Sequence, residues 1–288
     1  SYITLASPKA RATCVQRPGW HGENFILPDR VYGAGSRERI VLQHDAPQIQ
    51  LKQQGTLGQW QQNVGASCAD NSRLIVAMSA ALCGPLLHLL GEENFGLHFF
   101  GGSSVGKTTA LVVSASIYGT ALGSWRTTDN AAESNARQAN DALLLLDELS
   151  QVDAHAADAM AYMLGNGATK ARSRRDGSAR AAERFRLVFL SSGETGLAAK
   201  MMEGGRNPKA GQTVRFIEIP ADAGKGYGVF DTIHNFPDSN RLAIALKTNA
   251  DAYTGMVGDM YLQALTSDKT AIIASVIAAR TAWVAEYV

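Results

Sequence analysis

The sequence predicts an α/β fold with a parallel central sheet, and three short apolar runs support this prediction. Residues 95–100 form a run that is rich in aromatic side chains and bounded by glycines, as buried strands commonly are. Residues 143–146 are four consecutive leucines, and residues 187–190 read LVFL. Such runs are typical of parallel strands, because both faces of these strands are buried. A last strand is expected at 214–219, where Pro220 ends it.

The loop after the first run carries the most specific motif in the chain. Gly101, Gly106, Lys107 and Thr108 fit the pattern G-x-x-x-x-G-K-[ST], and a helix-like segment follows directly. Glycines let successive N–H groups point at phosphate oxygens, and the dipole of the following helix adds positive potential. Lys107 is expected to reach the β- and γ-phosphates of ATP, and the Thr108 hydroxyl is expected to hold Mg²⁺.

The expected ATP-binding residues form one continuous segment. The alternative is a glycine-rich turn that carries a lysine by chance. The strand before the loop and the helix after it argue against that alternative. The residues are Gly101, Gly102, Ser103, Ser104, Val105, Gly106, Lys107, Thr108 and Thr109.

Two carboxylates, Asp147 and Glu148, end the leucine run. At the C-terminal end of a strand next to the phosphate loop, Asp147 is placed to hold the Mg²⁺ shell. Glu148 can polarise the attacking water, which indicates hydrolysis rather than nucleotide binding alone. An ordinary acidic strand end is the alternative. The spacing of one strand–helix unit from the loop favours the functional interpretation.

Residues 170–186, KARSRRDGSARAAERFR, are strongly basic. Asp176-Gly177 is a hairpin-turn signal, and alternating residues of an extended strand share one face. The segment therefore predicts a basic β-hairpin that contacts DNA phosphates, with a solvated charged loop as the alternative. The candidate DNA-binding residues are Lys170, Arg172, Arg174, Arg175 and Arg180.

The third apolar run ends in Ser191 and Ser192, and Arg206 and Arg215 flank the connection to the last strand. Ser192 is expected to sense the γ-phosphate through a hydrogen bond. Three regions are predicted: a β-rich N-terminal subdomain at 1–60 with β-hairpins, an ATPase core at 61–235, and a helical lid at 236–288.

Two apolar segments require a decision between a membrane span and a packed helix. Residues 74–90 are slightly short for a span and contain Pro85, which is expected to break or restart the helix. Residues 271–288 are divided by Arg280. We expect both to be packed helices of a protein without a membrane partner.

Composition restricts the classes of function. With 288 residues, 45% of them hydrophobic, the chain can bury a sizeable core. A net charge of +1 excludes a protein that coats nucleic acid with its whole surface, so any DNA contact must be local. Three cysteines without a C-x-x-C pair suit a reducing cytoplasm. Without an initiator Met, the sequence is expected to be a fragment of a longer chain.

The order of these motifs resembles that of the AAA+ ATPases, in particular superfamily-three viral helicases and MCM-type replicative motors with a hairpin before the sensor strand. The segments GGSSVGKTTAL, SWRTTDN, LLLLDE, YMLGNGATKARSR, LVFLSSGE and AGQTVRF look more closely like the domain-of-unknown-function family nine-hundred-and-twenty-seven. Members of this family are helicase-like proteins of phages, plasmids and mobile islands, and are often fused to a primase-type module. The resemblance runs from about residue 17 to 235.

The resemblance implies roles for single residues. Lys107 and Thr108 would be the Walker A pair, and Asp147 and Glu148 the Walker B pair. Many AAA+ proteins have Asn as the first sensor, where this chain has Ser191 and Ser192. The expected arginine finger is Arg215, with Arg206 as the second candidate.

These roles imply an oligomeric, ring-shaped motor, with six subunits expected, that translocates on or unwinds DNA as the replicative helicase domain of a mobile element. Expected partners are a DNA single strand or fork and a primase-type module on a flank outside this sequence. A first rival is an ATP-dependent loader or remodelling switch that does not unwind. A second is a P-loop small-molecule kinase, which needs neither the basic hairpin nor an interface arginine.

Overall fold

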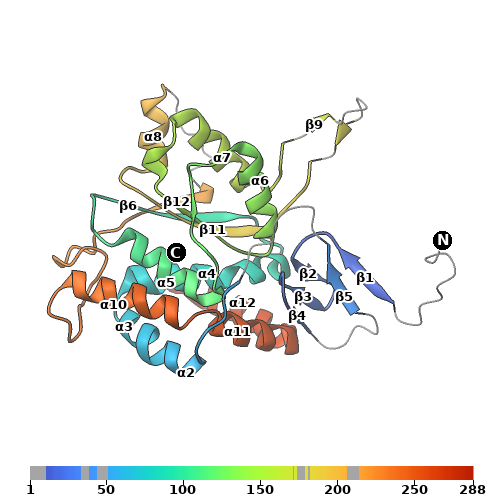
Figure 1. Ribbon diagram of the computed structural model, residues 1–288, viewed down its shortest axis with the longest axis horizontal. Helices are drawn as coiled ribbons and strands as arrows, with labels where there is room; N and C mark the ends of the chain where they lie inside the picture. Colours follow the sequence, from blue (N-terminus) through green and yellow to red (C-terminus); the bar gives the residue numbers. More distant parts are fainter. Residues whose placement is uncertain are drawn as a thin grey trace.

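The computed structural model describes residues 11–33, 39–43, 51–170, 172–173, 179–180, 182–205 and 214–287. Its centre is a five-stranded sheet in which every neighbouring pair is parallel, as the sequence predicts (Figure 1). The strands are β6 (Phe95–Phe100), β7 (Gly123–Ser124), β8 (Ala142–Asp147), β11 (Leu187–Gly193) and β12 (Phe216–Pro220).

The strand order is β12-β6-β11-β8-β7, so that β11 lies between β6 and β8. Leu190 pairs with Leu97 on one side and with Leu145 on the other. The carboxyl ends of the three strands therefore meet at one edge of the sheet. Ser191 and Ser192 lie at the carboxyl end of β11, as expected, where they pair with His98 and Phe99 of β6.

Helices cover both faces of the sheet. On one face, α4 (Ser72–Leu90) and α5 (Lys107–Tyr118) pack over a core that includes Leu74, Leu97 and Leu111 (Figure 1). On the other face, α6 (Asp129–Gln138), α7 (Ala154–Asn166) and α8 (Leu197–Glu203) enclose a second core with Leu146 and Phe189.

Helix α4 continues through Pro85, so the expected break there is wrong. Tertiary packing explains the difference. A Cβ at the preceding Gly84 would lie 2.6 Å from the carbonyl oxygen of Ala142, which shows how closely the helix approaches the start of β8. The indole of Trp20 donates a hydrogen bond of 2.8 Å to the Pro85 carbonyl. By length and composition α4 could cross a membrane, but it packs against α5, β8 and β11.

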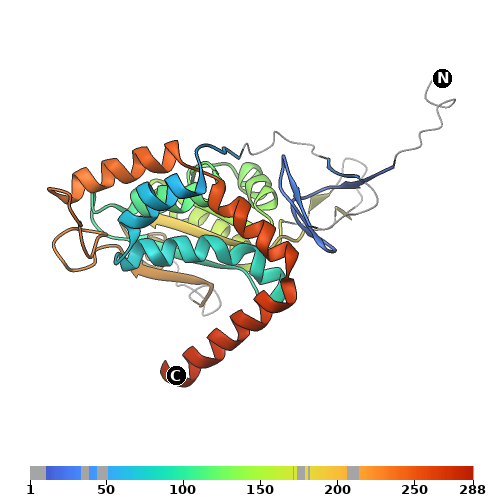
Figure 2. The ribbon, with the colours of Figure 1, turned by 90° about the horizontal axis from the view of Figure 1, so that it is seen from below.

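Three helices follow the sheet: α10 (Ser239–Ala252), α11 (Met256–Ser267) and α12 (Lys269–Tyr287). Helices α10 and α11 pack on α5. Helix α12 projects away from the body of the molecule and contains no fully buried residue, so the expectation of a packed helix holds only for its first turns, where Ile272 packs against the main core (Figure 2). The apolar side chains near its C-terminal end are exposed, with Trp283 57% and Tyr287 64% accessible.

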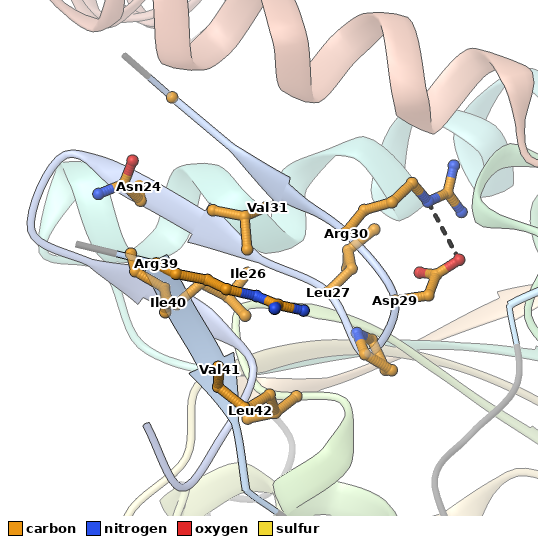
Figure 3. Close-up of a pocket in the computed structure, with 12 residues that line it drawn as sticks. Asn24, Ile26, Leu27, Asp29, Arg30, Val31, Arg39, Ile40, Val41 and Leu42 are labelled. Atoms are coloured by element: carbon orange, nitrogen blue, oxygen red, sulfur yellow. Dashed lines mark ion pairs between the residues drawn. The ribbon is translucent and has the colours of Figure 1, made fainter. Parts of the chain in front are cut away.

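The N-terminal region contains a three-stranded antiparallel sheet of β2 (Gly19–His21), β3 (Asn24–Ile26) and β4 (Val31–Tyr32), as hairpins predict. In contrast, β1 (Ala12–Val15) and β5 (Arg39–Leu42) pair in parallel and do not form a hairpin. A cleft of about 510 Å³ separates β5 from β3 and β4 (Figure 3). Trp20 and Phe25 join the same core as α4 and α5, so this sheet is continuous with the body.

Short helical segments lead from this region to α4. They are α2 (Leu57–Trp60), a π-helix (Gln61–Gly65) and α3 (Ala66–Cys68). The Thr56 side chain accepts a hydrogen bond from the Gln59 backbone, and the Gln59 side chain accepts one from the Thr56 backbone in return. This capping box explains why helical structure begins where the sequence changes character at Thr56.

Candidate nucleotide-binding site

The loop between β6 and α5 has the geometry that its glycines predict. Gly101 has φ 149° and Gly106 has φ 97°, which are values that favour glycine, and helix α5 begins at Lys107. Ser104 also has a positive φ of 63°. The strand–loop–helix order is therefore present. Ser103 and Ser104 are exposed, whereas the Thr109 side chain is buried and its backbone N–H donates to the Gly106 carbonyl.

Lys107 turns back over this loop. Its Nζ donates hydrogen bonds of 2.8 Å to the Gly101 carbonyl and 2.6 Å to the Gly102 carbonyl. Burial lowers the pKa of Lys107, and the charges of Glu194 and Asp147 oppose that shift. The ammonium group thus lies directly over the loop whose N–H groups would bind phosphate.

Thr108, in the first turn of α5, meets Asp147, at the end of β8, although β6 and β8 are not neighbours in the sheet. The Thr108 hydroxyl donates a hydrogen bond of 3.1 Å to Asp147 Oδ2 across the end of β11. A hydroxyl and a carboxylate are the oxygen ligands that hold Mg²⁺ beside a phosphate loop. The residues present therefore fit a Mg²⁺ ion bound together with a nucleotide.

Glu148 has an unusual backbone conformation. Its φ of 66° and ψ of 58° lie in the left-handed region, although it is not a glycine. Such a conformation costs about 1–3 kcal/mol and is concentrated at functional sites. Its side chain is exposed, and its backbone N–H donates to Ser192 Oγ at 3.3 Å. The exposed carboxylate is consequently held at the edge where the three strands end.

The two serines of β11 have different surroundings. Ser192 donates a short hydrogen bond to Asp147 Oδ1, so the two oxygens of this carboxylate accept from Ser192 and Thr108. Ser191 is fully buried; it accepts a hydrogen bond of 2.7 Å from the Trp125 indole and lies 2.8 Å from His98 Nδ1. His98 Nε2 lies 3.0 Å from the Thr195 carbonyl, which identifies Nε2 as the donor and Nδ1 as the acceptor for Ser191.

This buried chain of Trp125, Ser191 and His98 was not predicted. Burial lowers the pKa of His98, in agreement with a neutral ring. Trp125 also donates its backbone N–H to the Asp147 carbonyl at 3.1 Å. The chain therefore supports the backbone on either side of the candidate site. The sequence signal that could have revealed this chain is the presence of His98 and Ser191, two polar residues, inside otherwise apolar strands.

The segment after β12, at residues 221–230, lies against the phosphate loop. The Val229 N–H donates to the Val105 carbonyl at 2.7 Å. A Cβ at Gly106 would lie 2.6 Å from Val229 Cγ1, and a Cβ at Gly228 would lie 2.5 Å from the Val105 oxygen. The positive φ values of Gly224, Gly226 and Gly228 let the chain make this close approach.

Arg215 lies at the opposite edge of the sheet. It directly precedes β12, and its guanidinium pairs with Glu93, with Nε 2.9 Å from Oε2. Strand β12 runs beside β6, so about five residues, or roughly 17 Å, separate Arg215 from the level of the phosphate loop. The structure therefore does not bring Arg215 to the candidate site of its own chain. Arg206 lies outside the described residues.

The predicted hairpin is formed by β9 (Arg172–Ser173) and β10 (Ala179–Arg180), which pair antiparallel. Its base is attached to α6 at two points. Lys170 Nζ lies 2.5 Å from Asp129 Oδ2, and Arg137 Nε lies 2.7 Å from Glu183 Oε2. Lys170 is thus engaged in an ion pair. The candidates Arg174 and Arg175 lie outside the described residues.

Solved structures with a similar fold include a helicase. A solved structure described as "SCCmec type IV Cch - active helicase" matches with a TM-score of 0.67 and 18% identity. The match covers 90% of this chain and 48% of that chain, so the chain spans about half the length of the helicase. NtrX from Brucella abortus in complex with ATP matches with 14% identity over 59% of this chain and 37% of its own. Its TM-score of 0.31 is too low to support a common fold.

The sequence comparisons identify the family. No curated protein matches the chain significantly. The profile of the domain of unknown function DUF927 matches residues 1–184, which is more than half of the 288 residues. The match begins and ends earlier than the expected range of about 17 to 235. The chain belongs to the DUF927 family.

Proposed function

We propose that this chain is an ATP-hydrolysing motor domain of the AAA+ type that translocates on or unwinds DNA, within the replication machinery of a mobile genetic element. The main support is that Thr108 contacts Asp147 and Asp147 contacts Ser192. These contacts lie at the carboxyl edge of the sheet, where the phosphate loop follows β6. Glu148 follows Asp147 at the same edge. This combination of a cradle, oxygen ligands and an exposed carboxylate suits phosphoryl transfer to water.

Each residue has a proposed part in hydrolysis. The backbone N–H groups of 101–109 bind the phosphates, and Lys107 leaves its carbonyl partners to contact the β- and γ-phosphates. Thr108 and Asp147 would hold Mg²⁺, which neutralises phosphate charge when bound. Glu148 accepts a proton from the water whose oxygen attacks the γ-phosphorus, as the bond to the leaving oxygen of ADP breaks. Ser192 orients Asp147.

The motor function rests on the position of the hairpin. The chain passes from β8 through α7 to the hairpin and returns in β11, so both ends of the hairpin lead to strands of the candidate site. A shift of either strand during hydrolysis would move the hairpin and the DNA phosphates bound to it. The similar fold of a structure described as an active helicase agrees with this function.

The oligomeric state rests on Arg215. Because it lies far from the phosphate loop of its own chain, we propose that it reaches the γ-phosphate held by a neighbouring copy in a ring of six. Transition-state charge neutralised in this way is worth about 10³–10⁵ in rate in GTPases. A primase-type module elsewhere in the full-length protein is a further proposed partner.

The decisive experiment compares hydrolysis with strand separation. The parent chain should hydrolyse ATP faster with single-stranded DNA and should separate a forked duplex, and Glu148→Gln should do neither. A loader or remodelling switch would hydrolyse ATP in response to DNA and leave the fork intact. Absence of ATP binding to the parent, with Lys107→Ala as the blank, would contradict the nucleotide site itself.

A further inference from the structure

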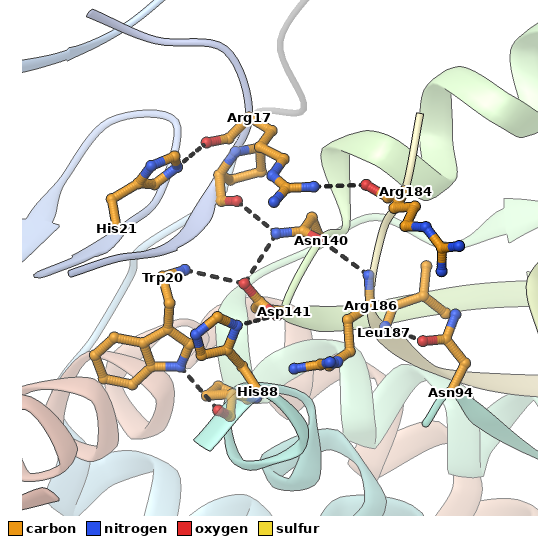
Figure 4. A network of polar contacts seen from close by, with 12 residues as sticks. Arg17, Trp20, His21, His88, Asn94, Asn140, Asp141, Arg184, Arg186 and Leu187 are labelled. Carbon is orange, nitrogen blue, oxygen red and sulfur yellow. Dashed lines mark hydrogen bonds and ion pairs between the residues drawn. The ribbon is translucent and has the colours of Figure 1, made fainter. Parts of the chain in front are cut away.

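A second polar cleft lies at the amino edge of the central sheet, opposite to the candidate nucleotide site. It has a volume of about 620 Å³. The end of α4, the turn before β6 and the segment that leads from the hairpin into β11 surround it. The N-terminal region closes one side with Arg17 (Figure 4). No residue of the phosphate loop contributes to this cleft.

The floor of this cleft is built from buried amide side chains. Asn140 is 2% exposed; its Nδ2 donates to the Pro18 carbonyl at 2.8 Å, and its Oδ1 accepts the Arg186 backbone N–H at 2.9 Å. Asn94 is 5% exposed, and its Oδ1 accepts the Leu187 N–H at 3.1 Å. The N-terminal region, the start of β8 and the start of β11 are thereby held together. A ligand would bind here with little ordering of the protein.

Asp141 completes this floor. Its Oδ2 accepts the Trp20 N–H at 3.0 Å and Asn140 Nδ2 at 2.9 Å, and burial raises its pKa. Its buried Oδ1 has no hydrogen-bond partner among the described residues and lies 3.9 Å from His88 Nδ1. His88 is half exposed and lines the cleft beside this carboxylate.

Arginines surround the floor. In the described parts of the chain, Arg17, Arg184 and Arg186 form no ion pair, although each lines the cleft. Arg17 Nη1 donates to the Arg184 carbonyl at 2.6 Å, which orients its guanidinium group (Figure 4).

The acidic residues of the rim are already engaged. Glu93 pairs with Arg215, and Glu92 pairs with Arg280 of α12 at 2.7 Å.

The floor carboxylate of Asp141 lies close enough to Arg17 and Arg186 for their charges to oppose the burial that raises its pKa, but none of the described ion pairs joins it to either arginine. The cleft thus has three arginines, Arg17, Arg184 and Arg186, against one buried carboxylate and keeps an excess of positive charge. Guanidinium groups bind phosphate oxygens with two parallel hydrogen bonds.

We propose that this amino-edge cleft binds successive phosphates of a DNA single strand, as a continuation of the hairpin. The inference rests on the proposed function. Arg184 pairs in an antiparallel bridge with Ala168 at the base of the hairpin, so a strand held by the hairpin can pass directly into the cleft. Apart from the half-exposed His88, whose ring stacks on Trp20, the aromatic residue that lines the cleft is Phe185, which is 4% exposed and offers no face for base stacking. Binding in the cleft is thus independent of base sequence.

The test is the salt dependence of oligothymidylate binding by the double variant Arg17→Gln, Arg186→Gln. Removing one arginine–phosphate interaction lowers the slope of log K against log salt by about 0.7, so we expect a decrease of about 1.4. The floor should persist, because Asn140 bonds to the backbone of Arg186 and not to its side chain. Arg17→Lys, Arg186→Lys should retain most of the slope. Lys247→Gln, at an exposed cation of α10, is the matched control and should match the parent.

Three outcomes contradict the proposal in different ways. A parental slope in the double variant, with weaker binding in hairpin variants, overturns the cleft and leaves the proposed function intact. Absence of oligothymidylate binding by the parent at low salt overturns both. The third outcome concerns ATP: the variant Lys107→Ala still binds one ATP, but the triple variant Lys107→Ala, Arg17→Gln, Arg186→Gln does not. In that case the cleft binds a free nucleotide and not a DNA strand. If the double variant does not fold, Arg17→Gln alone must lower the slope by about 0.7.

Discussion

The two edges of the central sheet hold charge in opposite ways. At the carboxyl edge, the polar groups bond to one another: Thr108 to Asp147, and Asp147 to Ser192. At the amino edge, buried amides such as Asn140 tie the segments together, while Arg17, Arg184 and Arg186 around them form no ion pair within the described ranges. The first edge is arranged to hold a metal ion and phosphate at one fixed point. The second leaves its charge available to an extended anion.

Strand β11 connects the two edges. Arg186 precedes its first residue, and Ser192 lies near its last, with β6 and β8 paired on either side. A small displacement of β11 along its axis would therefore change the hydrogen bond to Asp147 and the position of Arg186 together. In the proposed motor, β11 directly connects Ser192 of the nucleotide site with Arg186 of the DNA-binding cleft.

The largest expected effect comes from Arg215, an amino-edge residue that we propose acts on a neighbouring copy of the chain. Arg215→Ala should leave ATP affinity intact and lower turnover by about 10³–10⁵-fold, because the transition-state charge in the neighbour is no longer neutralised. ATP binding and steady-state hydrolysis measure the two quantities separately. Mixing Arg215→Ala with Glu148→Gln should restore part of the activity, since each variant can complete a site that the other lacks.

The control for this prediction is Glu93→Gln. It breaks the same ion pair while leaving the guanidinium group in place, so turnover should remain near that of the parent. If Glu93→Gln is as inactive as Arg215→Ala, the arginine has a structural role in its own chain. Failure of every mixture to recover activity, together with a monomer in sedimentation, would contradict the ring.

A smaller effect is expected at the carboxyl edge. Glu148→Gln should bind ATP but hydrolyse it about 10²–10⁴-fold more slowly, because the amide cannot accept the proton of the attacking water. Lys107→Ala should instead prevent productive nucleotide binding. Equilibrium binding and single-turnover hydrolysis distinguish these results. Parental turnover in Glu148→Gln would show that another group activates the water.

The contrast between the edges also explains what could be predicted from the sequence. The phosphate loop and the Asp147-Glu148 pair are continuous motifs, so residue order alone is sufficient to propose them as candidate site residues. The amino-edge cleft combines residues 17, 140 and 186, which no local pattern connects. The break expected at Pro85 failed for the same reason, since close packing of Gly84 against Ala142 maintains the helix. The polar chain through Ser191 depends on register between strands that are distant in sequence.

Substitutions in the hairpin test whether DNA binds on the amino-edge side of the sheet. Changing Lys170, Arg172 and Arg174 to alanine should lower the salt slope of single-strand binding by about 0.7 for each phosphate that is no longer bound. Because Lys170 is paired with Asp129, we expect Lys170→Ala to change the slope less than Arg172→Ala does. ATP affinity should not change. A parental slope in the triple variant would favour the protein-remodelling alternative.

The smallest expected effect concerns the attachment of α4 to the amino edge. In Gly84→Ala the new Cβ would lie 2.6 Å from the Ala142 carbonyl oxygen, so backbone must move and the free energy of unfolding should fall by about 1–3 kcal/mol. For a domain of about this size, that corresponds to roughly 2–12 °C in Tm. Gly58→Ala, in α2, is the matched control, because a Cβ at this position would meet nothing within 4 Å. This substitution should stabilise the chain slightly. An equal Tm for both variants would show that α4 and β8 are not held together as tightly as their backbones indicate. A lower Tm combined with a reduced salt slope for oligothymidylate would show that the floor of the cleft depends on this packing.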